Sequence, residues 1–382
     1  MPSTTVIHSA RIVSGGSMTT DGWVEFERDR ITAVGTGNAW RNRAKAAEVF
    51  DAAGRLLAPG FIDMHGHGGG GAAFDEGPSA ARTALATHRA HGTTRSVLSL
   101  VTGGLTAMVE RIHALTSLVR DDPLVLGLHL EGPFLAASFR GAHDPVLLRQ
   151  PDPASVTALL DAAENTVCQV TLASDLPGAG LAIEQFLAAG VRIAVGHTGA
   201  DFDQALTAFS DGASILTHAF NGMPDIHHRA PGPVMAAVQS RQVVLEVIAD
   251  GVHVHPALIA LLFRQAPGRV ALITDAMAAT GAPDGDYLLG SLPVTVRDGV
   301  ARTQAGGLAG STLTQDKALR VAVQDAGVPL PDAVEALTHV PATALGLDKE
   351  LGRLSAGFFA DAVLLDDDLQ VSAVWANGQR YL

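Results

Sequence analysis

Through the middle of the chain, short runs of apolar residues alternate with longer segments in which apolar residues recur at every third or fourth position. A short apolar run is typical of a buried β-strand, and the wider spacing is typical of an amphipathic helix. The pattern predicts helices at residues 79–91, 153–163, 180–189 and 201–210. It predicts strands around eight positions: Phe61, Ser96, Leu128, Val170, Ala194, Leu216, Val247 and Leu272.

Apolar strands that alternate with helices indicate an α/β protein with a parallel sheet whose faces are covered. Eight such units predict a (β/α)8 TIM barrel over residues 55–346. A doubly wound open sheet is the structural alternative. That fold needs a spaced glycine fingerprint after its first strand and an acidic residue further on, and the run Gly68–Gly71 lacks both.

The two ends of the chain have a different pattern from the middle. Before Leu56 and after Leu347 the chain consists of short β-like runs separated by turns. Because neither group can bury both of its faces alone, we expect residues 1–54 and 347–382 to pair into one small β-sandwich domain. The N-terminal runs lie at residues 5–8, 22–27, 30–35 and 47–51, and the C-terminal runs lie at 352–354, 360–366 and 374–381. A further hairpin is predicted between Tyr287 and Ala305, with its turn at 297–299.

Composition and charge narrow the range of functions. The 382 residues are 47% hydrophobic and carry a formal net charge of −13, which disfavours binding to nucleic acid or to an anionic membrane surface. An anionic substrate therefore requires local cations. Cys168 is the only cysteine and lies in an apolar run, so we expect a core residue and a reducing, cytoplasmic location. The sequence predicts neither a signal peptide nor a membrane-spanning segment.

The residues with the clearest chemical potential stand at the carboxyl ends of the predicted strands. His65 and His67 follow the first strand, and alternate residues on an extended strand share a face, so both rings can reach one point. Imidazole is a common metal ligand. Four more ligand-type residues end other apolar runs in the same way: Glu131, His197, His218 and Asp275. In a (β/α)8 barrel these ends form one rim, which predicts a metal site there.

This order of strand-end residues resembles the amidohydrolase superfamily, and within it the family of N-acetylglucosamine-6-phosphate deacetylases. The resemblance covers essentially the whole chain, because Gly357–Ala362 also matches the closing domain of that family. The motifs that carry it are His129-Leu-Glu-Gly-Pro-Phe134, Gly141-Ala-His143, Gly196-His-Thr198, Thr217-His-Ala-Phe-Asn-Gly-Met-Pro224, Ala249-Asp-Gly-Val-His253 and Thr274-Asp-Ala276.

The resemblance implies how the ligands are divided. Glu131, His197 and His218 would hold one divalent ion, and His65, His67 and Asp275 would hold a second that shares Glu131. Some members of the family work with one ion, but both strand-one histidines are present here, which favours a capacity for two. Nitrogen and oxygen ligands without thiolate suit Zn²⁺, while iron, manganese and cobalt are the alternatives.

The resemblance also implies catalytic roles for two residues. Asp275 is expected to act as the general base that moves a proton from water to the departing amine. Its alternative role is a helix N-cap. His253 is expected to polarise the acetyl carbonyl of the substrate, and its alternative role is that of a core histidine with a backbone partner. His255 is expected to point away from the site.

Further residues are expected to bind the substrate. Arg229 suits bidentate phosphate contact, and the resemblance leaves open whether it acts in its own subunit or across a homodimer interface. A solvated loop charge is the alternative for Arg229. The other expected substrate residues are Ala142, His143, Asn221, Gly222, His253, Leu308, Ala309 and Gly310. Asp63 and His88 are expected to have only packing or surface roles.

The function implied is the metal-dependent hydrolysis of a linear amide. The enzyme would convert N-acetyl-D-glucosamine 6-phosphate to D-glucosamine 6-phosphate and acetate in amino-sugar catabolism. A different amidohydrolase, acting on N-acyl-amino acids or cyclic amides, is one alternative. It is disfavoured by Arg229 and by the absence of a lysine at the fourth strand end, residues 173–176. An inactive scaffold is the other alternative, and the presence of all six ligand residues argues against it.

Overall fold

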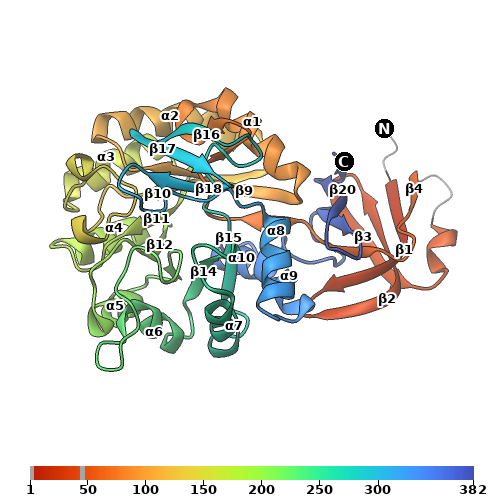
Figure 1. Cartoon of the computed structure of the whole chain (residues 1–382). Helices are drawn as coiled ribbons and strands as arrows, with labels where there is room; N and C mark the ends of the chain where they lie inside the picture. The colour runs from red at the N-terminus through yellow and green to blue at the C-terminus, as the bar shows by residue number, and fades with distance from the viewer. Residues whose placement is uncertain (1–3, 44–47) are drawn as a thin grey trace.

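The structure is a computed structural model that describes residues 4–43 and 48–382. Figure 1 shows a large body of strands and helices beside a smaller β domain that contains both ends of the chain. The predicted run at 47–51 appears as strand β4 (Glu48–Asp51), and its first residue, Ala47, lies outside the described residues. Residues 1–3 and 44–46 of the predicted sandwich domain also lie outside them.

The large body is built on a parallel sheet of eight strands that follow one another in chain order, and all eight predicted strands are confirmed. Their side chains are almost all buried, as expected for strands covered on both faces. The strands are β6 (Phe61–Asp63), β9 (Thr93–Val101), β10 (Val125–Glu131), β11 (Val167–Leu172), β12 (Arg192–Val195), β13 (Ile215–Leu216), β14 (Val244–Ile248) and β15 (Val270–Ile273).

Side chains join the first and last strands of this sheet into a nearly closed barrel. The buried Gln315 Nε2 donates hydrogen bonds to the carbonyl oxygens of Ile62, at 2.9 Å, and Leu272, at 3.4 Å. Asp63, at the end of β6, accepts a 2.6 Å hydrogen bond from Thr274 Oγ1, just beyond β15. These bonds hold the ends of β6 and β15 together, which matters because His65 and Asp275 follow directly.

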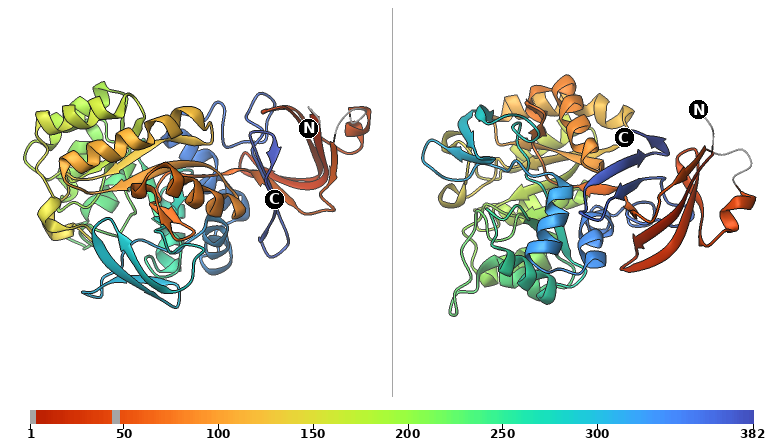
Figure 2. Two further views of the ribbon diagram at one scale, coloured as in Figure 1. Left: turned by 90° about the horizontal axis from the view of Figure 1, so that it is seen from above. Right: turned by 45° about the vertical axis from the view of Figure 1, so that its right-hand side comes forward.

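Helices cover the outside of the barrel, and the view from above in Figure 2 shows them around the central strands. The four predicted helices are all present, and each of their ends lies within one residue of the predicted position. The helices are α1 (Pro78–Ala90), α2 (Leu105–Asp121), α3 (Pro153–Ala163), α4 (Ala179–Ala188), α5 (Phe202–Ser210), α6 (Gly232–Gln239), α7 (Pro256–Gln265), α8 (Gln315–Arg320), α9 (Leu330–Leu337) and α10 (His339–Ala344). Among the described residues, none of these helices is both long and apolar enough to cross a membrane.

The smaller domain is one mixed sheet to which both chain ends contribute strands. The expected pairing of the ends is made by β5 (Leu56–Pro59), which pairs in parallel with β1 (Thr4–Ser14) and antiparallel with β19 (Ala362–Leu365). Phe26, Leu57 and Trp375 lie in its buried core. The predicted boundary at 54/55 assigns residues 56–59 to the barrel domain, whereas they form a strand of this sheet, so the barrel begins after that strand. The strands are β1 (Thr4–Ser14), β2 (Ser17–Glu27), β3 (Arg30–Thr36), β4, β5 (Leu56–Pro59), β19 (Ala362–Leu365), β20 (Val371–Ala376) and β21 (Gln379–Arg380).

A buried ion pair joins the two domains. Arg95 on β9 donates to Asp361, which precedes β19, with Nε–Oδ2 at 2.6 Å and Nη2–Oδ1 at 3.2 Å. Both side chains are buried. The guanidinium also lies over the ring of Phe359, 4.5 Å from its centroid. The pair therefore fixes a barrel strand against the terminal sheet.

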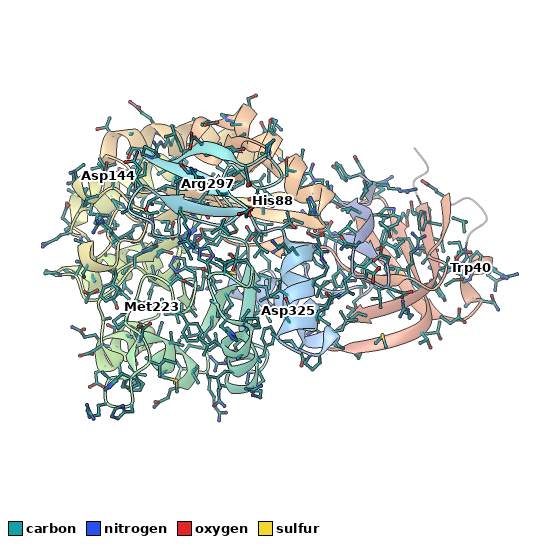
Figure 3. All side chains as sticks on the ribbon, in the orientation of Figure 1. Trp40, His88, Asp144, Met223, Arg297 and Asp325 are labelled. Carbon is teal, nitrogen blue, oxygen red and sulfur yellow. The ribbon has the colours of Figure 1, made fainter. Side chains whose placement is uncertain are left out.

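The predicted hairpin is part of a three-stranded antiparallel sheet inserted after β15. It consists of β16 (Gly285–Leu289), β17 (Leu292–Arg297) and β18 (Val300–Thr303), and the predicted turn joins β17 to β18. In Figure 3 the labelled Arg297 marks this sheet against the upper side of the barrel, and Met223 marks the loop that follows β13. The inserted sheet thus covers part of the rim where the predicted ligands lie.

Candidate metal centre

Three of the predicted ligands meet at the carboxyl ends of β10, β12 and β13. Glu131 Oε1 lies 3.1 Å from His197 Nε2 and 3.2 Å from His218 Nε2, and the two nitrogens lie 3.0 Å apart. All three residues are buried. The structure therefore brings together the first predicted ligand group.

The other three predicted ligands meet on the far side of Glu131. Asp275 Oδ1 lies 3.3 Å from His67 Nε2 and 3.7 Å from His65 Nε2. Glu131 reaches this group as well, because its Oε2 lies 3.1 Å from His67 Nε2. In each group the ligand atoms all lie within 4.8 Å of one another. Glu131 thus stands between two sets of donors, as a shared ligand must.

The hydrogen bonds of the histidines fit metal ligands. In its neutral form each ring donates from Nδ1 to an acceptor outside the cluster, and the lone pair of Nε2 is then directed into the cluster. The close approach of the Nε2 atoms of His197 and His218 is then a meeting of two acceptors, and a cation between them resolves it. The Nδ1 acceptors are Glu246 Oε2 for His65, at 3.0 Å, and the carbonyl oxygens of Ser99 for His67, Phe139 for His197 and Asn221 for His218.

The backbone is strained at three of the six ligand residues. His197, His218 and Asp275 have φ values of +46°, +26° and +48°, in the left-handed region that residues with a Cβ rarely adopt. Such conformations typically cost about 1–3 kcal/mol each and persist where the surrounding structure fixes them. At Asp275 a hydrogen bond fixes the strained backbone: its backbone nitrogen donates to His65 O at 2.9 Å. No helix begins at Asp275, so the N-cap alternative does not apply.

The electrostatics of the cluster favour positive charge. Burial lowers the pKa of His67, but hydrogen bonds to Asp275 and Glu131 outweigh it and raise this pKa to about 9. Burial raises the pKa of Asp275, but the hydrogen bond from His67 and the charge of His65 outweigh it and lower this pKa to about 2. Glu131 is likewise held well below its usual pKa by its histidine neighbours, against the effect of burial. The carboxylates are therefore ionised and bind either protonated imidazoles or cations.

A cavity of about 180 Å³ opens above the cluster. The backbone at residue 222 lies close to the ring of His197, and only glycine fits there, because a Cβ would lie 2.8 Å from His197 Nδ1. Most of the predicted substrate residues line this cavity, and the sequence did not indicate Ile248 or Leu289. The lining residues are His67, Glu131, Gly141, Ala142, His143, His197, His218, Asn221, Gly222, Ile248, His253, Asp275, Leu289, Leu308 and Gly310.

Two predicted substrate residues do not line this cavity. Ala309 is fully buried and packs with Met277 in the cluster beneath the inserted sheet. Arg229 is exposed on the loop between β13 and α6, where its Nη1 lies 2.7 Å from His228 Nε2. This loop, green in Figure 1, protrudes from the barrel, and Figure 2 shows the same protrusion from another side.

His253 forms a pair with a carboxylate that the sequence did not single out. Its Nδ1 lies 2.6 Å from Asp250 Oδ2, and both side chains are largely buried. Burial lowers the pKa of His253, but the hydrogen bond and charge of Asp250 more than compensate and raise it. The partner of His253 is thus a side chain rather than a backbone group. His255 lies outside the cavity, where its Nδ1 accepts from Ala257 N at the start of α7.

A buried polar layer lies beneath the ligands and was also missed. Its hydrogen bonds include Ser99 Oγ to His129 Nδ1 at 2.9 Å and His129 Nε2 to Thr171 Oγ1 at 2.8 Å. Asp63 belongs to the same environment and accepts from the backbone nitrogens of His65 and Thr274, so it does more than pack. The polar layer consists of Ser99, His129, Gln169, Thr171, Thr217 and Glu246. Apart from Thr217, which directly follows β13, these residues lie inside strands, where no strand-end signal marks them.

A parallel barrel that carries histidines and carboxylates at its strand ends, positioned as two metal-ligand groups, defines a metal-dependent hydrolase. The chain belongs to the amidohydrolase family, whose model matches residues 56–381. This confirms the resemblance found in the sequence.

Named relatives lie within the same family. The chain is 39% identical over 370 residues to an N-acetylgalactosamine-6-phosphate deacetylase of Escherichia coli O157:H7, covering 95% of this chain and 96% of that one. It is 36% identical over 330 residues to an N-acetylglucosamine-6-phosphate deacetylase of Vibrio furnissii, covering 85% and 82%. A Mycobacterium smegmatis N-acetyl-D-glucosamine-6-phosphate deacetylase mutant, solved in complex with N-acetyl-D-glucosamine-6-phosphate, is 42% identical with a TM-score of 0.94, covering 99% of both chains.

Proposed function

We propose that this chain is a metal-dependent deacetylase that converts N-acetyl-D-glucosamine 6-phosphate to D-glucosamine 6-phosphate and acetate. The observation that carries the proposal is the convergence of two ligand groups, joined by Glu131, beneath one cavity. The relatives supply the substrate class, because several of them are named for this reaction.

The ligand groups fit two divalent ions, one held by Glu131, His197 and His218 and one by His65, His67 and Asp275. A donor set of imidazoles and carboxylates suits Zn²⁺. When bound, a divalent ion supplies an activated water, since coordination lowers the pKa of water from 15.7 to about 7. Asp275 is ionised, and it accepts the proton of the attacking water and returns it to the departing amine.

His253 stabilises the charge that develops on the acetyl oxygen. Its Nδ1 is occupied by Asp250, so the ring nitrogen that remains for the substrate is Nε2. Asn221 and Gly222 present polar groups to the sugar phosphate from the loop after β13, and Ala142, His143, Leu308 and Gly310 shape the cavity around the sugar. Ala309 supports this wall from behind.

Arg229 binds the phosphate in the cavity of a second copy of this chain. Two features support this assignment: the guanidinium is absent from the lining of its own cavity, and it lies on a protruding loop with the exposed Ile226. The active form is therefore a homodimer. A cytoplasmic location is consistent with the single cysteine, Cys168, whose thiol pKa is raised to about 12 by burial.

A second candidate substrate is N-acetyl-D-galactosamine 6-phosphate. The observation that favours it is the 39% identity to a relative named for that epimer, which extends over nearly the whole of both chains. The same ligands and the same proton transfers serve either epimer, so the two candidates differ only in the sugar wall of the cavity.

The decisive experiment compares acetate release from the two epimeric 6-phosphates and from unphosphorylated N-acetylglucosamine. We expect activity on at least one phosphate ester to disappear with a chelator and to return with Zn²⁺. The ratio of kcat/KM between the epimers then identifies the substrate. Equal kcat/KM for N-acetylglucosamine and its phosphate ester would refute the sugar-phosphate assignment and favour another amidohydrolase reaction. Activity that persists in the metal-free protein would refute the metal-dependent mechanism.

A further inference from the structure

One fully buried carboxylate contacts the metal centre without belonging to either ligand group. Glu246 lies on β14, two residues before the cavity-lining Ile248, and alternate residues of a strand share a face, so its side chain points into the barrel. Its Oε2 accepts from His65 Nδ1 at 3.0 Å, and its Oε1 accepts from Gln169 Nε2 at 3.0 Å. Both oxygens accept, as expected of an ionised carboxylate.

The contact with His65 differs from those of the other ligand histidines. His67, His197 and His218 donate from Nδ1 to neutral backbone carbonyls, whereas His65 donates to a carboxylate. A charged acceptor fixes the ring more strongly and makes the opposite nitrogen a better electron-pair donor. The rings of His65 and His129 also pack against each other edge to face, with centroids 4.6 Å apart. His65 is therefore the ligand histidine whose orientation and basicity are most specifically controlled.

We propose that Glu246 is a positioning residue that sets the affinity of the His65, His67 and Asp275 group for the second metal ion. The inference rests on the proposed function, because it presupposes that this group holds an ion. Glu246 also touches the first group, through a 3.4 Å contact from His218 N, but that contact is a longer backbone bond that a neutral oxygen can accept as well. The effect is thus confined to one of the two ions.

The test is a titration of metal-free protein with Zn²⁺ against a competing chromophoric chelator, which yields a Kd for each ion. In Glu246→Gln the amide oxygen still accepts from His65, but the negative charge is lost. We expect the second Kd to weaken about 10- to 100-fold, the usual effect of removing such a partner, and the first Kd to stay unchanged. A His65→Asn, His67→Asn double variant identifies the first Kd, because only the Glu131 group remains intact.

A swapped variant, Glu246→Gln with Gln169→Glu, is the matched control. It retains one carboxylate and one amide in the polar layer, with the same net charge, but moves the carboxylate away from His65. The second Kd is expected to stay weak. Wild-type affinity for the second ion in either variant would overturn the inference. If circular dichroism shows that Glu246→Gln alone does not fold, the second Kd of the swapped variant tests the inference instead.

The wild-type titration separates this inference from the proposed function. If the wild-type chain binds one Zn²⁺ with the affinity of the double variant, the role of Glu246 is refuted, while a one-metal deacetylase remains. If it binds no Zn²⁺, the proposed function itself fails.

Discussion

The pair formed by His253 and Asp250 leads to a prediction about pH. A carboxylate can only accept, so Asp250 keeps a proton on Nδ1 of His253 at 2.6 Å. A neutral ring of that tautomer has no proton on Nε2, and only the imidazolium can donate to the acetyl oxygen. Because the pKa of His253 is raised, the donating form persists to higher pH than in a free histidine and is lost as pH rises through that pKa.

Asp250→Asn changes this arrangement with little change in shape. The Asn oxygen can still accept from the backbone nitrogens of Val252 and His253, both at 2.8 Å in the wild type. The Asn amide donates to Nδ1, so the neutral ring now carries its proton on Nε2. Donation no longer requires the imidazolium, and the alkaline fall in kcat/KM that belongs to His253 disappears.

The maximal rate falls because the donor becomes neutral. A hydrogen bond that involves a charged group contributes about 1.5–3 kcal/mol, against about 0.5–1.5 kcal/mol for a neutral one. The difference of about 1–1.5 kcal/mol corresponds to a roughly tenfold loss in kcat/KM.

The assay is a pH profile of kcat/KM from pH 5 to 10 for wild type, Asp250→Asn and the control Asp366→Asn. Asp366 caps a turn of the small domain in a similar way, accepting from Gln370 N at 2.8 Å, and is not among the residues that line the cavity. We expect the control to follow the wild-type profile. If kcat/KM of Asp250→Asn still falls at the same alkaline pH as that of the wild type, the assigned tautomer and the role of His253 are refuted.

Three further predictions follow from the same contacts. Asp275→Asn should lower kcat by about 10²–10⁴ with little change in KM in steady-state assays, and a variant that retains kcat would remove Asp275 as the base. Arg229→Ala should mainly raise KM, as loss of ground-state phosphate binding does, and an unchanged KM with a collapsed kcat would contradict its role. Asp361→Asn leaves the Arg95 guanidinium buried without its partner, so denaturant unfolding should show a loss of about 3–5 kcal/mol, and a loss below about 1 kcal/mol would show that the pair does not hold the domains together.

The strand-end rule explains why the ligands could be predicted from the sequence. Each of the six ends an apolar run, and a parallel barrel brings all such ends to one rim. A residue such as Glu131 is therefore visible as a polar break after Val125–Leu130, without any knowledge of its neighbours. The barrel strands were predictable because burial on both faces leaves its mark on every residue of a strand. The pairing of the chain ends was predictable for another reason, because their short β-like runs cannot bury both faces alone.

The residues that control the ligands leave no comparable mark. Glu246 interrupts the run Val244–Ile248 at its centre, and only the barrel shows that its side chain meets His65, 181 positions earlier. Asp250 was visible inside a motif, but its bond to His253 depends on the turn geometry between them. The hydrogen bond from Gln315 to Ile62, which helps to close the barrel, joins residues more than 200 positions apart, and local sequence patterns carry no signal of such a contact.

The charge balance of the centre connects these observations. Three buried carboxylates, those of Glu131, Asp275 and Glu246, contact His65 or His67 beneath the cavity. Without metal, hydrogen bonds to Asp275 and Glu131 raise the pKa of His67 to about 9, so a proton on this imidazole meets part of that charge. A ligand nitrogen must lose its proton to coordinate, so each bound ion takes over the charge that the protons carried, and acid competes with metal for the same nitrogens. The carboxylates that stabilise the protonated histidines are thus the carboxylates that would stabilise the bound ions. Glu246 acts in this way through His65, and therefore on the second ion only.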